Sequence, residues 1–358
     1  MKTTIAPARK IRVGVLGATG AVGQTFIRLL ADHPWFEVAC VAASERSAGK
    51  RYRDAAHWLS GEIPESVANL TVTTCEPAAV DAQIVFSALD SDAAQEVEAA
   101  FARAGRLVLS NARNYRMDAD VPLLIPEVNP DHLGLLPIQR KARGWSGAIV
   151  TNSNCSTMVI ALALAPLHQA FGVEQLFVTT LQALSGAGYP GVPSLDILGN
   201  IIPFIGGGEE EKIESEPLKI LGTFANGAVT PADMRVSAQV NRVGVEHGHT
   251  ACMSVKLASP TTPDAAMKAL TSWSGAIAGL GLPSAPAQPV IVTMERDRPQ
   301  PRRDVNAGNG MSVVVGRVRS DPMLDLRLVA MGHNTIRGAA GASILNAELM
   351  FARGLLAQ

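Results

Sequence analysis

The sequence is poor in the features that mark several large classes of protein. Its four cysteines are far apart, with no CxxC pair and no Cys/His cluster at metal-ligand spacing. Neither a disulfide scaffold nor a metal site is therefore expected. No run of about 18 apolar residues occurs, which argues against a membrane span. The beginning, MKTTIAPARKIRVGVLG, interrupts its apolar residues with lysine and arginine, unlike a secretory signal. We expect a cytoplasmic protein with reduced thiols and no membrane partner.

The sequence also lacks a net charge of either sign. Its 31 basic and 32 acidic residues leave a formal charge of −1, so no long-range field favours nucleic acid or an anionic membrane as a partner. An anionic ligand has to be bound by locally placed arginines and lysines. The 358 residues exceed what one ordinary core accommodates, and two domains are expected.

The first 150 residues alternate between strand and helix patterns. Residues 11–16 (IRVGVL) and 36–43 (FEVACVAA) are typical of strands, and 20–31 of an amphipathic helix. The same order repeats further along, in residues 82–89, 93–105 and 106–111. Such alternation predicts a parallel sheet covered by helices on both faces, which is an α/β fold.

The pattern changes near residue 150. A long apolar helix is expected over about 156–170, and the strands after it alternate in polarity. Residues 311–321 and 324–332 resemble neighbouring antiparallel strands with one face against helices. Residues 285–310 are rich in proline and charge and are expected to form a surface excursion, whereas 335–356 are helical in tendency.

A glycine turn lies between the first strand and the first helix. GVLGATGAVG places three glycines at three-residue intervals, where the backbone can approach a pyrophosphate bound at the helix N-terminus. Alone this GxxGxxG variant would equally suit tight packing, but after a strand and before a helix it predicts nucleotide binding. The residues of this turn expected at the cofactor are Gly17, Ala18, Thr19, Gly20, Ala21, Val22 and Gly23.

The residues after the second strand bear on the choice of cofactor. Ser44, Arg46, Ser47 and Lys50 offer hydroxyl and basic donors for a 2′-phosphate. Glu45 could instead bind a ribose hydroxyl, as in NAD enzymes. Because the donors outnumber the acid, NADP is favoured over NAD.

Cys155 stands in a polar setting, TNSNCSTMVI (151–160), just before the expected apolar helix. The positive end of a helix stabilises a thiolate, which is the nucleophilic form of cysteine. Asn154 and nearby N–H groups could then donate to an oxyanion formed when the thiolate attacks a carbonyl. Burial is the alternative for any cysteine, and it suits Cys40 and Cys252, inside apolar strands, better than Cys155.

The segment NRVGVEHGHT offers two candidate acid/base partners, His247 and His249. The residues alone do not choose between them. Arg242 and His249 differ in parity, so they cannot share a face of one regular strand. A bulge or turn at Gly244 and Gly248 would bring both to one site.

Seven segments together resemble the aspartate-β-semialdehyde dehydrogenase family, most closely its archaeal and fungal branch. They are GATGAVG, SNARNYRM, SNCST, LQALSGAG, EEEKIESEPLKILG, NRVGVEHGHT and NTIRGAAGASILNAEL, in the family's order over nearly the whole chain. The resemblance implies a Rossmann-type dinucleotide-binding domain plus an α+β catalytic and dimerisation domain of the semialdehyde dehydrogenase type. The expected ranges are 1–152 with 338–358 for the first and 153–337 for the second.

The resemblance also implies roles for individual residues. Cys155 becomes the nucleophile, His249 the acid/base, and Asn154 the group that orients the acyl oxygen. At the substrate, it implies Arg242 for the α-carboxylate, Glu209 for the amine, Lys212 and Arg116 for the phosphate, and Gln182 in a matching glutamine position. At the cofactor, it implies Asn334 near the nicotinamide. Beside the glycine turn, the residues expected to contact the cofactor are Ser44, Arg46, Ser47, Ser87 and Gly186.

Three of these assignments have alternatives. Glu209 and Lys212 stand three residues apart on an expected helix, so ordinary surface pairing would also explain them. Arg113 lies close enough to Arg116 to take its role at the phosphate.

The expected reaction is the NADP-dependent reductive dephosphorylation of β-aspartyl phosphate to aspartate β-semialdehyde and phosphate, through a cysteine thioacyl-enzyme. It serves the biosynthesis of lysine, threonine and methionine. The alternatives are malonyl- or succinyl-CoA reductase, or another acyl-phosphate reductase, on the same scaffold. A non-catalytic NADP-binding module is disfavoured by the polar setting of the cysteine. The resemblance further implies a homodimer or homotetramer.

Overall fold

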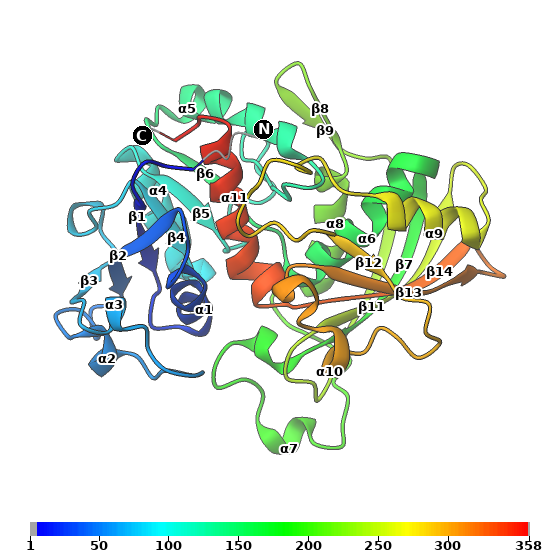
Figure 1. Ribbon diagram of the computed structural model, residues 1–358, viewed down its shortest axis with the longest axis horizontal. Coiled ribbons are helices and arrows are strands. Elements are labelled where there is room, and N and C mark those ends of the chain that lie inside the picture. Colours follow the sequence, from blue (N-terminus) through cyan, green and yellow to red (C-terminus); the bar gives the residue numbers. More distant parts are fainter. Residues whose placement is uncertain (1–5, 357–358) are drawn as a thin grey trace.

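The computed structural model describes residues 6–356 and arranges their strands in two large sheets and one small hairpin (Figure 1). The first sheet is parallel throughout and has the order β3-β2-β1-β4-β5-β6. Its strands are β1 (Ile11–Leu16), β2 (Phe36–Ala43), β3 (Val72–Thr74), β4 (Ile84–Ser87), β5 (Leu107–Ser110) and β6 (Ala148–Thr151). This order is that of a doubly wound dinucleotide-binding domain, which confirms the fold expected for this half.

Helices cover both faces of this sheet because its strands are apolar on both sides. Ile84 and Phe86 of β4 belong to the core formed with α1 (Ala21–Leu30) and α11 (Gly341–Ala352). Val85, between them, faces the opposite core with α4 (Ser91–Arg103), since successive side chains of a strand alternate. The short helices of this half are α2 (Tyr52–Ala55), α3 (Glu65–Ala68) and α5 (Leu136–Arg143).

The second sheet is mixed and has the order β10-β7-β11-β14-β13-β12. Its strands are β7 (Val173–Gln182), β10 (Arg235–Arg242), β11 (His249–Leu257), β12 (Val290–Val292), β13 (Val313–Ser320) and β14 (Leu326–Gly332). It packs against α6 (Cys155–Phe171), α8 (Glu209–Ile220) and α9 (Pro263–Ser272). The remaining elements are the hairpin β8 (Thr223–Ala225) and β9 (Ala228–Thr230) and the short helices α7 (Ser194–Ile197) and α10 (Pro301–Asp304).

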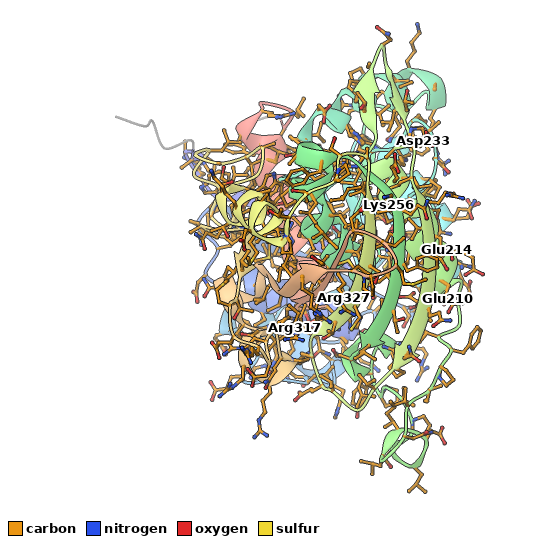
Figure 2. The ribbon with its side chains drawn as sticks, turned by 90° about the vertical axis from the view of Figure 1, so that its right-hand side faces the viewer. Glu210, Glu214, Asp233, Lys256, Arg317 and Arg327 are labelled. Carbon is orange, nitrogen blue, oxygen red and sulfur yellow. The ribbon has the colours of Figure 1, made fainter. Side chains whose placement is uncertain are left out.

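The other face of the second sheet is open to solvent. Phe177 of β7 is 55% exposed there, and Cys252 of β11 is exposed. The expectation that Cys252 is buried is therefore wrong, because its side chain shares the open face of β11 with Ser254 and Lys256. Figure 2 views this side of the molecule, with Glu210, Glu214 and Asp233 along one edge and Arg317 and Arg327 toward the other.

Two segments differ in detail from the sequence pattern. The expected surface excursion contains β12, which pairs with β13 in parallel and adds an edge strand to the sheet. Its three residues form too short a pattern for a strand to be predicted from the sequence. The C-terminal segment begins with a π-helical turn, Ile336–Ala340, before α11. Among the described residues, no helix has the length and apolar character needed to cross a membrane.

Candidate active site

Cys155 is the first residue of α6, and Asn154 caps that helix. The side-chain oxygen of Asn154 accepts the N–H groups of Ser156 at 2.9 Å and Thr157 at 3.1 Å. Asparagine is among the best residues for this position because its oxygen satisfies otherwise unpaired N–H groups. The cap explains why the apolar helix begins at the cysteine and leaves the sulfur at its positive end.

His249 is the histidine that reaches the thiol. Its Nε2 lies 3.2 Å from Sγ of Cys155, while Nδ1 accepts the backbone N–H of Ala183 at 3.0 Å. Because Nδ1 is an acceptor, the proton of the neutral ring is at Nε2 and faces the sulfur. His247 lies elsewhere, with Nδ1 2.9 Å from the hydroxyl of Ser185.

Burial keeps both reacting groups neutral in the free protein. It raises the pKa of Cys155 to about 12, and the nearby charge of Glu209 adds to the rise, whereas Arg116 and Arg242 lower it. Burial also lowers the pKa of His249 to about 3, helped by the charge of Arg242. The expected stabilisation of a thiolate by the helix end is thus outweighed here by desolvation.

Gln182 and Arg242 are brought beside His249 by the ends of three neighbouring strands. Gln182 ends β7, and Arg242, which ends β10, pairs with it directly. On the other side of β7, the first residues of β11 pair with its last ones. The parity problem disappears because Arg242 and His249 lie on two different strands. Arg242 donates to the carbonyl of Ala183 at 2.7 Å, which fixes its guanidinium at the site.

One face of α8 turns charged side chains toward these elements. Glu209 accepts from the amide of Asn154 at 2.9 Å and pairs with Lys212 at 3.2 Å. Further along the same face, Glu216 and Lys219 are buried. Surface pairing therefore does not describe Glu209, which is 7% exposed. The opposite side of the helix carries Glu210 and Glu214, whose carboxylates accept N–H groups of the edge strand β10.

The two candidate phosphate arginines differ in their surroundings. Arg116 is buried and pairs with Glu216 at 2.8 Å, while its other terminal nitrogen donates to the carbonyl of Asn111 at 2.7 Å. Arg113 is exposed and donates to the carbonyl of Gly207 at 3.0 Å. Both face the same cavity.

A cavity of about 450 Å³ connects these groups. Four cationic and two acidic side chains line it, namely Arg113, Arg116, Lys212, Arg242, Asp90 and Glu209. Cys155, Asn154, Gln182, Gly186 and Asn334 also line it. Its excess of positive charge suits a ligand with more than one negative group. No cluster of metal-binding side chains occurs within residues 6–356.

Two glycines make room at the reacting atoms. A Cβ on Gly338 would lie 2.6 Å from Cβ of Cys155, and one on Gly186 would lie 2.9 Å from the His249 ring and 3.0 Å from Arg242. Side chains at either position would displace the sulfur or the groups around it. The π-helical turn brings Gly338 this close, as such turns often do at functional sites.

The glycine turn has the form of an anion site. Gly17 has φ of 72°, and a Cβ there would lie 2.6 Å from the carbonyl of Ala88. Gly20 precedes α1, whose first turn has neither a side-chain cap nor an acidic residue. The N–H groups at this helix end are therefore left for an anionic ligand. Ala18, Thr19, Ala21, Val22 and Gly23 complete the turn, and Val22 lines the cavity.

The other residues expected at the cofactor lie in different places. Ser44, Arg46 and Ser47 follow β2 at the same edge of the sheet as the glycine turn, since Leu16 pairs with Ala42. Asn334 is held by the N–H of Gly248 at 2.9 Å and donates to Ser185 at 2.8 Å. Ser87 ends β4, is fully buried and does not line the cavity.

Sequence reasoning missed Glu216, Lys219 and the buried pair Arg337–Glu127, whose nitrogens and oxygens lie 2.7–2.8 Å apart. A signal for the first two was present. The charged residues Glu209, Lys212, Glu216 and Lys219 follow one another at spacings of three, four and three, which places them on one helical face. Charges at the spacing usually taken by apolar residues indicate a polar site facing that side of the helix.

Comparison with known proteins gives consistent matches over the chain. The family models described as semialdehyde dehydrogenase, NAD binding domain, and semialdehyde dehydrogenase, dimerisation domain, match residues 12–136 and 164–337. Aspartate-semialdehyde dehydrogenase of Archaeoglobus fulgidus is 54% identical over 94% of this chain and 97% of its own. That of Schizosaccharomyces pombe is 48% identical over 96% and 99%. The crystal structure of aspartate semialdehyde dehydrogenase with NADP from Candida albicans has a TM-score of 0.90 and 44% identity, covering 97% of this chain and all of that one.

Proposed function

The chain belongs to the aspartate-semialdehyde dehydrogenase family, and we infer that it reduces β-aspartyl phosphate to aspartate β-semialdehyde with NADPH. The product feeds the biosynthesis of lysine, threonine and methionine. The observation that carries this function is the approach of His249 Nε2 to Sγ of Cys155, 3.2 Å, in a cavity with charges for both ends of the substrate.

The residues at the glycine turn fit NADP. The uncapped, acid-free start of α1 suits a pyrophosphate, and Ser44, Arg46 and Ser47 offer donors for the 2′-phosphate at the same edge of the sheet. Bound NADPH supplies the hydride for the carbonyl carbon. Asn334 and Gly186, which line the cavity next to Cys155, are proposed to contact its nicotinamide half.

We assign the first chemical step to Cys155. Its sulfur forms a bond to the acyl carbon, the bond from that carbon to the phosphate oxygen breaks, and the thiol proton ends on the departing phosphate. Arg116 and Lys212, which line the cavity, hold the phosphate as it leaves. Arg113 is the alternative phosphate ligand. The product of this step is a thioester on Cys155.

His249 and Asn154 serve the acyl oxygen. Asn154 gives one amide hydrogen to Glu209, and its second amide hydrogen is available to the acyl oxygen. His249 donates from Nε2 to the same oxygen as it gains charge during hydride addition. Because Nδ1 is occupied by the N–H of Ala183, any proton that His249 gives up has to be replaced at Nε2.

The remaining charges match the rest of the substrate. Arg242 is proposed to bind the α-carboxylate, with Gln182 beside it on the neighbouring strand. Glu209 is proposed to bind the ammonium group. An ammonium beside Glu209 would neutralise the charge that raises the pKa of Cys155, so substrate binding itself favours the thiolate.

The substrate distinguishes this function from malonyl- or succinyl-CoA reductase, whose substrates are thioesters with neither an α-ammonium group nor an acyl-phosphate bond. The test compares aspartate β-semialdehyde, phosphate and NADP with malonyl-CoA and NADPH, in the same preparation. We expect rapid NADP reduction that depends on phosphate and little oxidation of NADPH by the thioester. Faster turnover of malonyl-CoA would contradict the proposed substrate.

We further propose that the protein is a homodimer formed by the open face of the second sheet. The acidic edge of this face (Glu210, Glu214, Asp233) and its basic side (Arg317, Arg327) lie on opposite sides of it (Figure 2). A two-fold axis through the face would place the acidic edge of each copy against the basic side of its partner. Residues 164–337 match the dimerisation-domain model, which supports this choice.

We propose the domain division 1–152 with 338–358 for cofactor binding and 153–337 for catalysis and dimerisation. Its support is that α11 packs in the first core, through residues such as Leu345 and Leu349. Residues 1–5 and 357–358 of these ranges lie outside the described residues. We also propose a cytoplasmic location, since all four cysteines are unpaired, as in reducing compartments. Recovery of the activity in another cell fraction would contradict this location.

A further inference from the structure

Glu216 connects the nucleophile to the phosphate-binding arginine. One oxygen of its carboxylate accepts from Arg116 at 2.8 Å, and the other accepts the backbone N–H of Asn154 at 2.6 Å. The residue is 1% exposed. Both oxygens are thus used. A single carboxylate joins the turn before Cys155 to the guanidinium of Arg116, which lies 100 residues before Glu216 in the chain.

The rest of α8 fixes the same two parts. Glu209 holds the amide side chain of Asn154, so carboxylates of one helix hold both the main chain and the side chain of that residue. At the other end, the ammonium of Lys219 donates to the carbonyls of Arg116, Asp118 and Val121 at 2.7–2.8 Å. The loop that carries Arg116 is therefore anchored to the helix that holds the nucleophile's turn.

Stability alone is a poor explanation for this arrangement. Replacing a buried ion pair with well-packed apolar residues is often neutral or stabilising. Glu216 lies next to a cavity whose phosphate ligands have to stay cationic and in place, and its negative charge partly offsets Arg116. A role in orienting Arg116 would explain why a buried carboxylate, that of Glu216, lies at a site that binds anions.

We propose that Glu216 is a positioning residue that sets the distance between the sulfur of Cys155 and the anion-binding guanidinium of Arg116. This rests on the proposed function, in which phosphate leaves from, or attacks, the acyl group on Cys155. Glu216 touches neither substrate nor cofactor. Its effect reaches the reaction through Arg116, so it governs phosphate capture more than the formation of the thioester.

The test uses Glu216→Gln, which keeps the shape but presents an amide to two donors. In the aldehyde-oxidising direction, the KM for inorganic phosphate should rise about tenfold to a hundredfold, the effect of a charge-assisted hydrogen bond. The KM for NADP, and the amount of NADPH formed in a single phosphate-free turnover, should stay within about twofold. A merely structural defect would reduce both phosphate-dependent turnover and the phosphate-free turnover.

Glu211→Gln is the matched control, because it removes the same charge from the same helix but at an exposed position that does not line the cavity. Its phosphate KM should equal that of the unaltered protein. In an Arg116→Met background, Glu216→Gln should change the phosphate KM by less than about twofold, since the two residues act together. If Glu216→Gln is insoluble, Glu216→Asp replaces it, because aspartate keeps the charge but is too short to reach both partners. The KM for phosphate should then rise by a smaller factor, and the phosphate-free turnover should again be unchanged.

An unchanged phosphate KM in Glu216→Gln, or equal loss of the phosphate-free turnover, would overturn the proposal. An additive effect in the Arg116→Met background would also overturn it. Failure of the proposed function is recognised separately, since the unaltered protein would then form no NADPH from aspartate β-semialdehyde.

Discussion

Nε2 of His249 lies 3.2 Å from Sγ of Cys155, although 94 residues separate them in the chain. The contact joins the first residue of a helix to the first residue of a strand. The backbone N–H of Ala183 occupies the other nitrogen of the ring, so the proton of the histidine faces the sulfur. His249 is therefore set up to donate to whatever charge develops at or beside the sulfur.

Glu209→Gln should make the thiol of Cys155 more reactive toward alkylation and should lower the catalytic efficiency of the enzyme. Glu209 raises the pKa of Cys155, so its neutralisation should lower that pKa and speed alkylation by iodoacetamide at neutral pH. Loss of the partner for the substrate amine should lower kcat/KM for aspartate β-semialdehyde about tenfold to a thousandfold. Alkylation rates between pH 7 and 10 and steady-state kinetics measure the two effects.

Glu211→Gln is the control for this prediction, since Glu211 lies in the same helical turn but is exposed. It should change neither quantity by more than about twofold. If Glu209→Gln leaves the thiol no more reactive than Glu211→Gln does, the assigned charge effect is wrong.

Gly338→Ala should reduce kcat by about a hundredfold or more without unfolding the protein. The new methyl group would lie 2.6 Å from Cβ of Cys155 and 3.0 Å from its Cα, so the cysteine has to move. Displacements of about 1 Å cost this much in catalysis. Gly341→Ala is the comparison, because its methyl group first meets the flexible thioether of Met311. A kcat within twofold of normal in Gly338→Ala, with circular dichroism unchanged, would show that the close approach does not matter.

Stability should fall as the pH rises from about 4.5 to about 7, because of Glu98. This residue is fully buried and accepts from the hydroxyl of Ser110 at 2.8 Å. Burial raises its pKa from 4.5 to about 7, although Ser87, Ser110 and Arg116 lower it. The folded protein therefore holds this proton more tightly than the unfolded chain, and the stabilisation is lost between about pH 4.5 and 7.

Thermal unfolding of Glu98→Gln tests that expectation. Residue 98 cannot ionise in the variant. The difference in unfolding temperature, variant minus unaltered protein, should therefore increase between pH 5.5 and 8. A difference between the two proteins that stays constant over this range would exclude Glu98 as the source.

Arg327→Glu should weaken the proposed dimer. The substitution would place like charges opposite the acidic edge of the partner copy. Sedimentation velocity should show dissociation at concentrations where the unaltered protein is dimeric. Lys268→Glu makes the same change on α9, an exposed position on the covered side of the sheet, and should leave the dimer intact. Equal behaviour of the two variants would argue against the open face as the interface.

The sequence predicted well what depends on local pattern. Strand, glycine turn and helix occur as expected around residues 11–31, and α6 begins at Cys155 because Asn154 caps it. The alternation of strands and helices was sufficient to predict the first sheet, since parallel strands require such crossovers.

What escaped prediction depends on contacts between distant segments. The thiol pKa could not be predicted, because the helix end is visible in the sequence whereas burial and the approach of Glu209 are not. The inward face of α8 escaped because Glu216 and Lys219 bind loop and turn residues about 60 to 100 positions away. Cys252 was misplaced although a signal was present, since the alternation of β11 puts it on the same face as Ser254 and Lys256.

The most direct test of Cys155 as the nucleophile is one turnover without phosphate. Aspartate β-semialdehyde and NADP are mixed with the enzyme in phosphate-free buffer, NADPH is followed by absorbance, and the quenched protein is digested and mapped by mass spectrometry. We expect a burst of one NADPH per active chain, an aspartyl group on Cys155, and steady turnover only after phosphate is added. Cys155→Ser should bind NADP but show no burst. Continuous NADPH formation without phosphate, or an acyl group on Cys40, Cys75 or Cys252, would contradict this assignment.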